Sequence, residues 1–146
     1  PRPPPPPPPP QQDPDMPNPP RRHATSGSPL EPRIGFSRAV RVGAHIAVAG
    51  TAPIDQAGGP TPEGVHAQTR LILAIIAGAL AQVGAGLEHV VRTRVMLTDI
   101  TTWEEDARAH GEAFGDIRPA ATFMAVSAFI DPAWKVELEV DAIVPD

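Results

Sequence analysis

The chain has 146 residues, and its 21 prolines concentrate between Pro1 and Pro20, so the foldable part has the size of one ordinary domain. No cysteine is present, which excludes disulfides, thiolate nucleophiles and cysteine-ligated zinc. The net charge is −5 and Lys135 is the single lysine, so no general basic field exists to hold a phosphate backbone, and nucleic acid is a disfavoured partner.

Residues 1–22 are predicted to be a disordered proline-rich tail, ahead of one domain at residues 23–146. Proline with Gln, Asp and Asn favours solvated polyproline II and offers nothing apolar to bury. The tail is either a ligand for a proline-binding module or, as we favour, a passive extension or sequence upstream of a true start at Met16. A proline run cannot form the apolar segment of a signal peptide, so a cytoplasmic protein is expected.

A β-hairpin is predicted after the tail. Polar and apolar side chains alternate over residues 36–42, and an apolar run follows at residues 45–49 after a Gly43-Ala44 turn. A helix should then begin with Thr61 as its N-cap and end near Val83. The uncharged stretch that this helix contains is slightly short for the roughly 20 apolar residues of a membrane span, so it indicates a buried helix.

A strand with one polar face is predicted at residues 90–100, where β-branched residues are frequent. Alternation places Val91 and Thr93 on one side of the pleat and Arg92 and Arg94 on the other.

A second helix should follow, capped by Thr101 or Thr102, because each has a glutamate three residues further on, as a capping box requires. It is expected to end at Gly115. Its predicted core stripe consists of Trp103, Ala107, His110 and Phe114.

Two final strands are predicted at residues 121–129 and 135–144. The order β-β-α-β-α-β-β predicts an α+β fold, with a mixed sheet of five or six strands and two helices on one face. Apolar residues occur on both faces of such a sheet, so a partner subunit is expected to bury the other face.

Five segments carry a resemblance when taken together, in their order and spacing: residues 35–40, 48–53, 91–99, 118–122 and 135–139. They resemble the RidA (YjgF-type) family, some members of which are described as endoribonucleases (endoribonuclease L-PSP). The resemblance implies a chorismate-mutase-like fold and a homotrimer with a ligand cleft at each subunit interface. In deaminase members, the cleft hydrolyses reactive enamines and imines to 2-oxo acids and ammonia without a metal or organic cofactor.

The resemblance also assigns cleft residues, and this chain departs from several of them. Ala121 stands where the deaminases have a carboxylate-binding arginine, Phe36 replaces a tyrosine and Phe123 replaces a cysteine. Glu137 matches the glutamate proposed to position the attacking water, and the backbone of Gly50 should line the same cleft. The chain therefore resembles a divergent member that lacks the deaminase arginine.

Arg118 and Arg108 are two candidates to replace the lost arginine, although each is more simply a surface residue. Otherwise the ligand has no carboxylate and is more apolar. Glu137, Glu139 and Asp141 share one side of a strand at a spacing of roughly 7 Å, which fits either a tuned general base or a solvated face.

Other polar residues favour structural roles. His110 should be a buried, hydrogen-bonded histidine, and the remaining histidines lack metal-ligand spacing, so no metal site is expected. The arginines that could form a basic patch are interpreted as interface or surface ion-pair formers, because no aromatic residues accompany them for RNA stacking; they are Arg38, Arg41, Arg92 and Arg94.

The leading hypothesis is a cytoplasmic homotrimer that hydrolyses imines or enamines with an altered substrate range. Glu137 would be the catalytic residue, in a cleft that also contains Gly50. The alternative is a non-catalytic protein that binds a small molecule, and the third reading is an endoribonuclease.

Overall fold

The structure is a computed structural model that describes residues 1–8, 14–17 and 19–145. Residues 9–13 and 18 of the predicted tail therefore lie outside the described part, and the tail residues that are described contain no helix or strand before Arg21. The elements are β1 (Arg21–Ala24), α1 (Leu30–Ile34), β2 (Ala39–Val42), β3 (His45–Thr51), α2 (Val65–Gln82), β4 (Val90–Leu97), α3 (Trp103–Phe114), β5 (Ala120–Ala125) and β6 (Val136–Ile143). Single 3₁₀ turns occur at Leu87–His89 and Ile100–Thr102.

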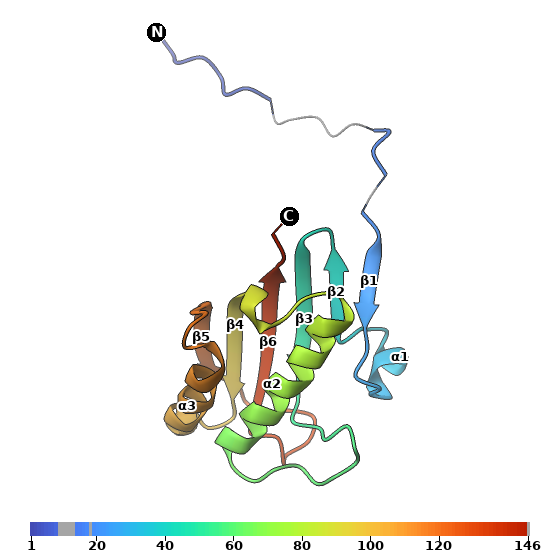
Figure 1. Ribbon diagram of the computed structural model, residues 1–146. Coiled ribbons are helices and arrows are strands. Elements are labelled where there is room, and N and C mark those ends of the chain that lie inside the picture. Colours follow the sequence, from blue (N-terminus) through green and yellow to red (C-terminus); the bar gives the residue numbers. More distant parts are fainter. Residues whose placement is uncertain (9–13, 18, 146) are drawn as a thin grey trace.

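The strands form one six-stranded mixed sheet in the order β1-β2-β3-β6-β4-β5, which confirms the predicted α+β class. β4 and β5 are parallel because α3 carries the chain back between them, and all other neighbours are antiparallel. Figure 1 shows α2 and α3 on the same face of the sheet, with the C-terminus beside the turn that joins β2 and β3. We call the opposite face the open face.

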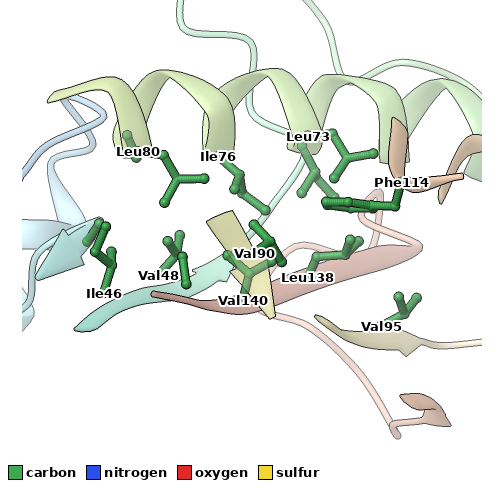
Figure 2. Packing of buried hydrophobic residues seen from close by; sticks show 14 of the residues in the cluster. Ile46, Val48, Leu73, Ile76, Leu80, Val90, Val95, Phe114, Leu138 and Val140 are labelled. Atoms are coloured by element: carbon green, nitrogen blue, oxygen red, sulfur yellow. The ribbon is translucent and has the colours of Figure 1, made fainter. Parts of the chain in front are cut away.

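The core lies between the sheet and the two long helices. Leu73, Ile76 and Leu80 point from α2 toward side chains of β3 and β6 (Figure 2). Along β6 the apolar residues alternate with acidic ones, so that Val136, Leu138, Val140 and Ala142 are at most 1% exposed. This alternation places the three carboxylates of β6 on the open face.

The helix α2 begins later than predicted. Thr61 does not cap it, because Gly64, with φ of 88°, is the N-cap and Val65 is the first helical residue. The predicted end is confirmed, since α2 stops at Gln82 and Gly84 takes a φ of 78°. α2 is long and apolar enough to cross a membrane, by length and composition only. Half of the helix is buried inside the fold, as expected for a core helix.

Thr102, one of the two predicted residues, is the N-cap of α3, but the predicted capping-box hydrogen bond is not formed. Asp99 instead caps the preceding 3₁₀ turn, where its side chain accepts a hydrogen bond from the Thr101 amide, and Thr102 makes no side-chain cap. In the predicted core stripe Phe114 is 2% exposed, as expected, but Trp103 is 48% exposed. Asp106 and Ala109 are buried as well, so Trp103 lies at the edge of the buried stripe rather than within it.

The predicted strands differ from the observed ones in two ways, and two short elements were missed. The strand predicted at residues 121–129 ends at Ala125. Val91 is exposed because the pairing of β4 with β6 shifts between Val90 and Arg92, which buries Val90 instead. The short elements β1 and α1 were not predicted, and β1 includes two residues, Arg21 and Arg22, that the prediction placed in the tail.

Asp106 is a fully buried carboxylate between α3 and α2. Its Oδ2 accepts a 3.0 Å hydrogen bond from Thr69 Oγ1, while Oδ1 has no partner among the described residues. Burial raises the pKa of Asp106 from 3.8 to about 6, against the smaller lowering effect of Thr69. The folded state therefore binds this proton more tightly than the unfolded state does.

We expect Asp106→Asn to change how stability depends on pH. Between pH 4 and pH 7 the native protein loses stability as Asp106 is forced to ionise, by up to about 3 kcal/mol, whereas the variant has no such group. Urea unfolding at several pH values measures the free energy of unfolding of both proteins. As pH rises, the value for Asp106→Asn should increase relative to the value for the native protein. A constant difference between the two proteins would contradict the raised pKa.

Candidate functional site

A cavity of about 360 Å³ opens where β3 ends and β6 begins. Segment 26–30 and α1 form one wall, and residues of the β5–β6 connection form another. Three of the residues assigned to the cleft from the sequence line this cavity together: Phe36, Gly50 and Glu137. We call it the Glu137 pocket.

Glu137 is the second residue of β6 and is half-buried in the pocket wall. Its carboxylate makes no hydrogen bond or ion pair with any other residue in the described ranges. Burial raises the pKa of Glu137 above 4.5, and the positive charge of Arg38 partly opposes that rise. A carboxylate whose pKa is raised is a stronger base than an exposed one and can accept a proton from a bound water.

Gly50 lies directly beside this acid. A Cβ atom on Gly50 would lie 3.9 Å from Glu137 Oε1, which is ordinary contact distance. Gly50 belongs to a stretch of β3, between Val48 and Thr51, where the pairing with β6 is irregular. The irregularity leaves the Gly50 carbonyl available to a side chain, and Arg38 uses it.

Arg38 is the pocket residue that the sequence analysis missed. It is only 6% exposed, and its Nη1 donates to Gly50 O at 2.7 Å and to Thr51 Oγ1 at 3.1 Å. Its guanidinium also lies 5.3 Å from the centre of the Phe36 ring. The prediction that Arg38 forms surface or interface ion pairs is wrong, because this side chain turns into the pocket.

The other predicted cleft residues lie elsewhere in the chain. Ala121 pairs with Thr93 and Phe123 with Val95, so both belong to the face that the helices cover, and the Phe123 ring is 5.8 Å from His110. Glu137 pairs with Met96 on the opposite side of the pleat. Within a single chain, Ala121 and Phe123 therefore lie on the other face of the sheet from Glu137.

Neither candidate replacement arginine enters the Glu137 pocket. Arg118 is exposed just before β5, with a φ of 56°, and Arg108 is exposed on α3. Arg38, rather than either of them, is the guanidinium that one chain places beside Glu137.

Ion pairs cover the remaining charges of β6 on the open face. Arg94 Nη1 lies 3.2 Å from Glu139 Oε1 and 3.4 Å from Asp141 Oδ2, and Arg92 Nε lies 3.8 Å from the same Asp141 atom. The ion-pair prediction is thus confirmed for Arg92 and Arg94. Arg41 instead donates to the carbonyls of Gly43 and Val83, so for Arg41 the prediction is wrong. Exposed pairs of this kind contribute at most about 1 kcal/mol each.

His110 has the structural role expected of it. It shares a 2.8 Å hydrogen bond with Thr93 Oγ1 and contacts Phe114, with ring centres 4.8 Å apart. Burial lowers the pKa of His110, which favours the neutral imidazole. The described residues contain no group of three or more side chains placed to hold a metal ion.

Comparisons with known proteins agree with this fold. The family model of endoribonuclease L-PSP matches residues 26–144. A protein of Streptomyces coelicolor is 40% identical over 83% of this chain and 90% of its own length, and a RutC family protein of Pyrococcus abyssi is 34% identical over 63% of this chain and 73% of its own.

Solved structures give the same result. The crystal structure of Rv2704 from Mycobacterium tuberculosis, a member of the YjgF/YER057c/UK114 family, is 44% identical, with a TM-score of 0.78 over 85% of this chain and 99% of the other. The fold and the matched residues define a YjgF-type α+β domain. The chain belongs to the RidA (YjgF-type) family, whose sequence model carries the name endoribonuclease L-PSP.

Proposed function

We propose that this protein hydrolyses imines or enamines, with Glu137 as the group that positions and deprotonates the attacking water. The observation that carries the proposal is the half-buried Glu137 carboxylate, which has a raised pKa and no hydrogen-bond partner among the described residues, in the wall of a largely apolar pocket. A water held there would be oriented toward the C=N carbon of a bound ligand.

The proposed reaction balances without a cofactor. Water adds to the carbon of the protonated imine while one of its protons passes to Glu137, and the resulting carbinolamine carries the hydroxyl and the amine on one carbon. Glu137 then returns that proton to the nitrogen. As the C–N bond breaks and the carbonyl forms, the hydroxyl proton passes to the departing ammonia, so a 2-oxo acid and an ammonium ion leave. An enamine enters the same sequence after tautomerising to its imine.

The direct test is hydrolysis of imines generated in situ from several amino acids by an amino-acid oxidase. Release of ammonia and 2-oxo acid should be faster with the purified protein than without it for at least one imine. No acceleration with any of them would contradict the proposed function.

The proposal includes a cytoplasmic location, which was expected from the sequence.

A homotrimer is part of the proposal. The open face exposes Val42 and Ile143, and Ala121 and Phe123 can approach a Glu137 pocket only if that pocket belongs to another copy. Light scattering at micromolar concentration should therefore give three times the 15.4 kDa mass of one chain. A stable monomer would leave the pocket without its second wall and would count against the proposal.

A non-catalytic binding protein is the second candidate, favoured by the apolar side chains of Phe36 and Trp134 in the pocket. Its signature is a ligand that raises the melting temperature and is recovered unchanged.

RNA cleavage, which the family name suggests, should come with steeply salt-dependent RNA binding. The net charge of −5 and the paired arginines of the open face weigh against it.

A further inference from the structure

Gln68 is a buried polar residue that the proposed reaction does not use. It lies in the first turn of α2 and is 2% exposed. Its Nε2 atom donates to Pro62 O at 2.9 Å and to Ala133 O at 3.0 Å, and its Oε1 atom accepts from the Lys135 amide at 2.8 Å. A carbonyl can only accept and an amide N–H can only donate, so these three partners fix the orientation of the side-chain amide.

Two of these hydrogen bonds enclose Trp134. Ala133 O belongs to the peptide group before Trp134 and the Lys135 N–H to the peptide group after it, so one side chain holds both. The arrangement resembles the pairing of a residue with a neighbouring strand, with the glutamine amide in place of a backbone. Trp134 lines the Glu137 pocket, and Glu137 follows three residues later. Gln68 therefore fixes where Trp134 and the start of β6 lie relative to α2.

The third hydrogen bond, to Pro62 O, holds the connection between β3 and α2. This connection, residues 52–64, contributes Ile54 to the pocket, and the connection 126–135 contributes Ile130. In the part of the chain that the structure describes, neither connection contains a helix or a strand. One buried side chain thus joins two irregular segments of the pocket wall to the core helix.

We infer that Gln68 is a positioning residue of the Glu137 pocket, and that with Trp134 it selects imines whose carbon carries a large apolar substituent. An indole ring held at a fixed place offers the ligand a flat apolar surface. Without the glutamine, the ring moves with its connection, and a large substituent loses this contact while a small one loses little. The choice of an imine as ligand rests on the proposed function, whereas the fixing of Trp134 does not.

The Lys135 amide tests the contact in the native protein. Lys135 is exposed and belongs to an irregular connection, where amides normally exchange fast. Its N–H should nevertheless exchange with deuterium at least about tenfold more slowly, after correction for intrinsic rates, than the amides of residues 128–130. Those amides make no hydrogen bond with the described residues. Equal exchange rates, measured by NMR, would overturn the inference.

The fluorescence of Trp134 reports its position without any turnover. The chain has two tryptophans, so Trp103→Phe leaves Trp134 as the single indole in every protein compared. Gln68→Met has a similar length but removes all three hydrogen bonds. Acrylamide should therefore quench Trp134 at least about twofold more strongly in this variant, because the connection that carries the ring is released.

Gln82→Met is the matched control on the same helix. Gln82 also encloses a backbone residue, because it accepts from the Thr25 amide at 3.0 Å and donates to Thr25 O at 2.8 Å. Thr25 is not among the described residues that line the Glu137 pocket. Gln82→Met therefore loses comparable hydrogen bonds, yet its Trp134 should be quenched as in the native protein.

Gln68→Glu guards against a folding defect in Gln68→Met. It keeps the shape and the oxygen that accepts from Lys135, but it loses both N–H donors, so the Ala133 carbonyl is released and quenching should again rise. Native quenching in the folded Gln68 variants would overturn the inference. Should neither variant fold, the Lys135 exchange rate and the imine preference of Trp134→Ala decide, since Trp134→Ala should lose the preference for the larger substituent.

Imine kinetics measure the selectivity with the imines of leucine and alanine, generated by an amino-acid oxidase. The native kcat/KM should be about tenfold or more higher for the leucine imine, as expected for extra methylenes in an apolar pocket. Gln68→Met should reduce this ratio at least about threefold, mainly through KM, because the lost contact is made in binding rather than in the chemical step. Gln82→Met should keep it. The ratio is measured within each protein, so a smaller folded fraction does not imitate the effect.

The two proposals can fail separately. If Gln68 fixes Trp134 but no imine is hydrolysed, the positioning role stands and the proposed function fails. If imines are hydrolysed and a folded Gln68→Met protein keeps the native ratio, the inference alone is overturned.

Discussion

Replacing Glu137 by glutamine should reduce imine hydrolysis by about 10²- to 10⁴-fold, the range typical of a lost general base. Glutamine has nearly the same shape and keeps an oxygen beside Gly50, but it cannot take a proton from water. The rate constants for ammonia release by the native and Glu137→Gln proteins measure the effect. The fold should be unaffected, because the Glu137 carboxylate bonds to no other described residue.

Glu139→Gln is the matched control, since Glu139 lies two residues further along β6 and on the same side of the strand. Its carboxylate is engaged by Arg94 outside the Glu137 pocket, so the variant should hydrolyse imines within a few-fold of the native rate. Equal losses in both variants would indicate a general effect of charge on the sheet and contradict the assigned role.

The native rate should also depend on pH with a defined sign. A general base works only when ionised, so kcat/KM should fall as pH falls through the pKa of Glu137. Burial raises that pKa above the ordinary 4.5, and the fall should therefore begin at a higher pH than for an exposed glutamate.

Phe114→Ala should lower the free energy of unfolding by about 3–5 kcal/mol, the range for truncating a buried phenylalanine. The ring is 2% exposed and packs in the core at the end of α3, beside His110. Its removal leaves a cavity that the sheet below cannot fill. Chemical unfolding followed by circular dichroism measures the loss, which should lower Tm by roughly 10 °C.

Trp103→Ala is the control on the same helix. The periodicity of the sequence placed Trp103 and Phe114 in one core stripe, yet Trp103 is 48% exposed. Its truncation should therefore cost less than about 1 kcal/mol, as for most surface residues. Similar costs for both aromatic residues would mean that Trp103 is covered in solution, for instance by another copy of the chain.

Those parts of the fold that depend on local pattern were predictable. The turn at Gly43-Ala44 and the apolar alternation on both sides of it specify the β2–β3 hairpin. Glycine after α2 marks where that helix ends. The alternation of β6 correctly placed its carboxylates on one side of the strand.

The pocket could not be predicted in full, because its key features depend on contacts between distant parts of the chain. Arg38 has the same alternation in the sequence as the exposed arginines of β4, and only the irregular pairing of β3 with β6 gives it a carbonyl to bind. Asp106 likewise resembles its exposed acidic neighbours until α2 packs against α3. The family resemblance supplied Glu137, Gly50 and Phe36, which the pattern alone would not have selected.

The strict alternation of β6 limits how this chain can vary in length. Adding or deleting one residue between Val136 and Ala142 would send the acids into the core and the valines to the surface. The connection at residues 126–135 has no such limit, and it contributes Ile130 and Trp134 to the rim of the cavity. Relatives can therefore acquire different ligand preferences by lengthening or shortening this connection while the strand that carries the acid stays fixed.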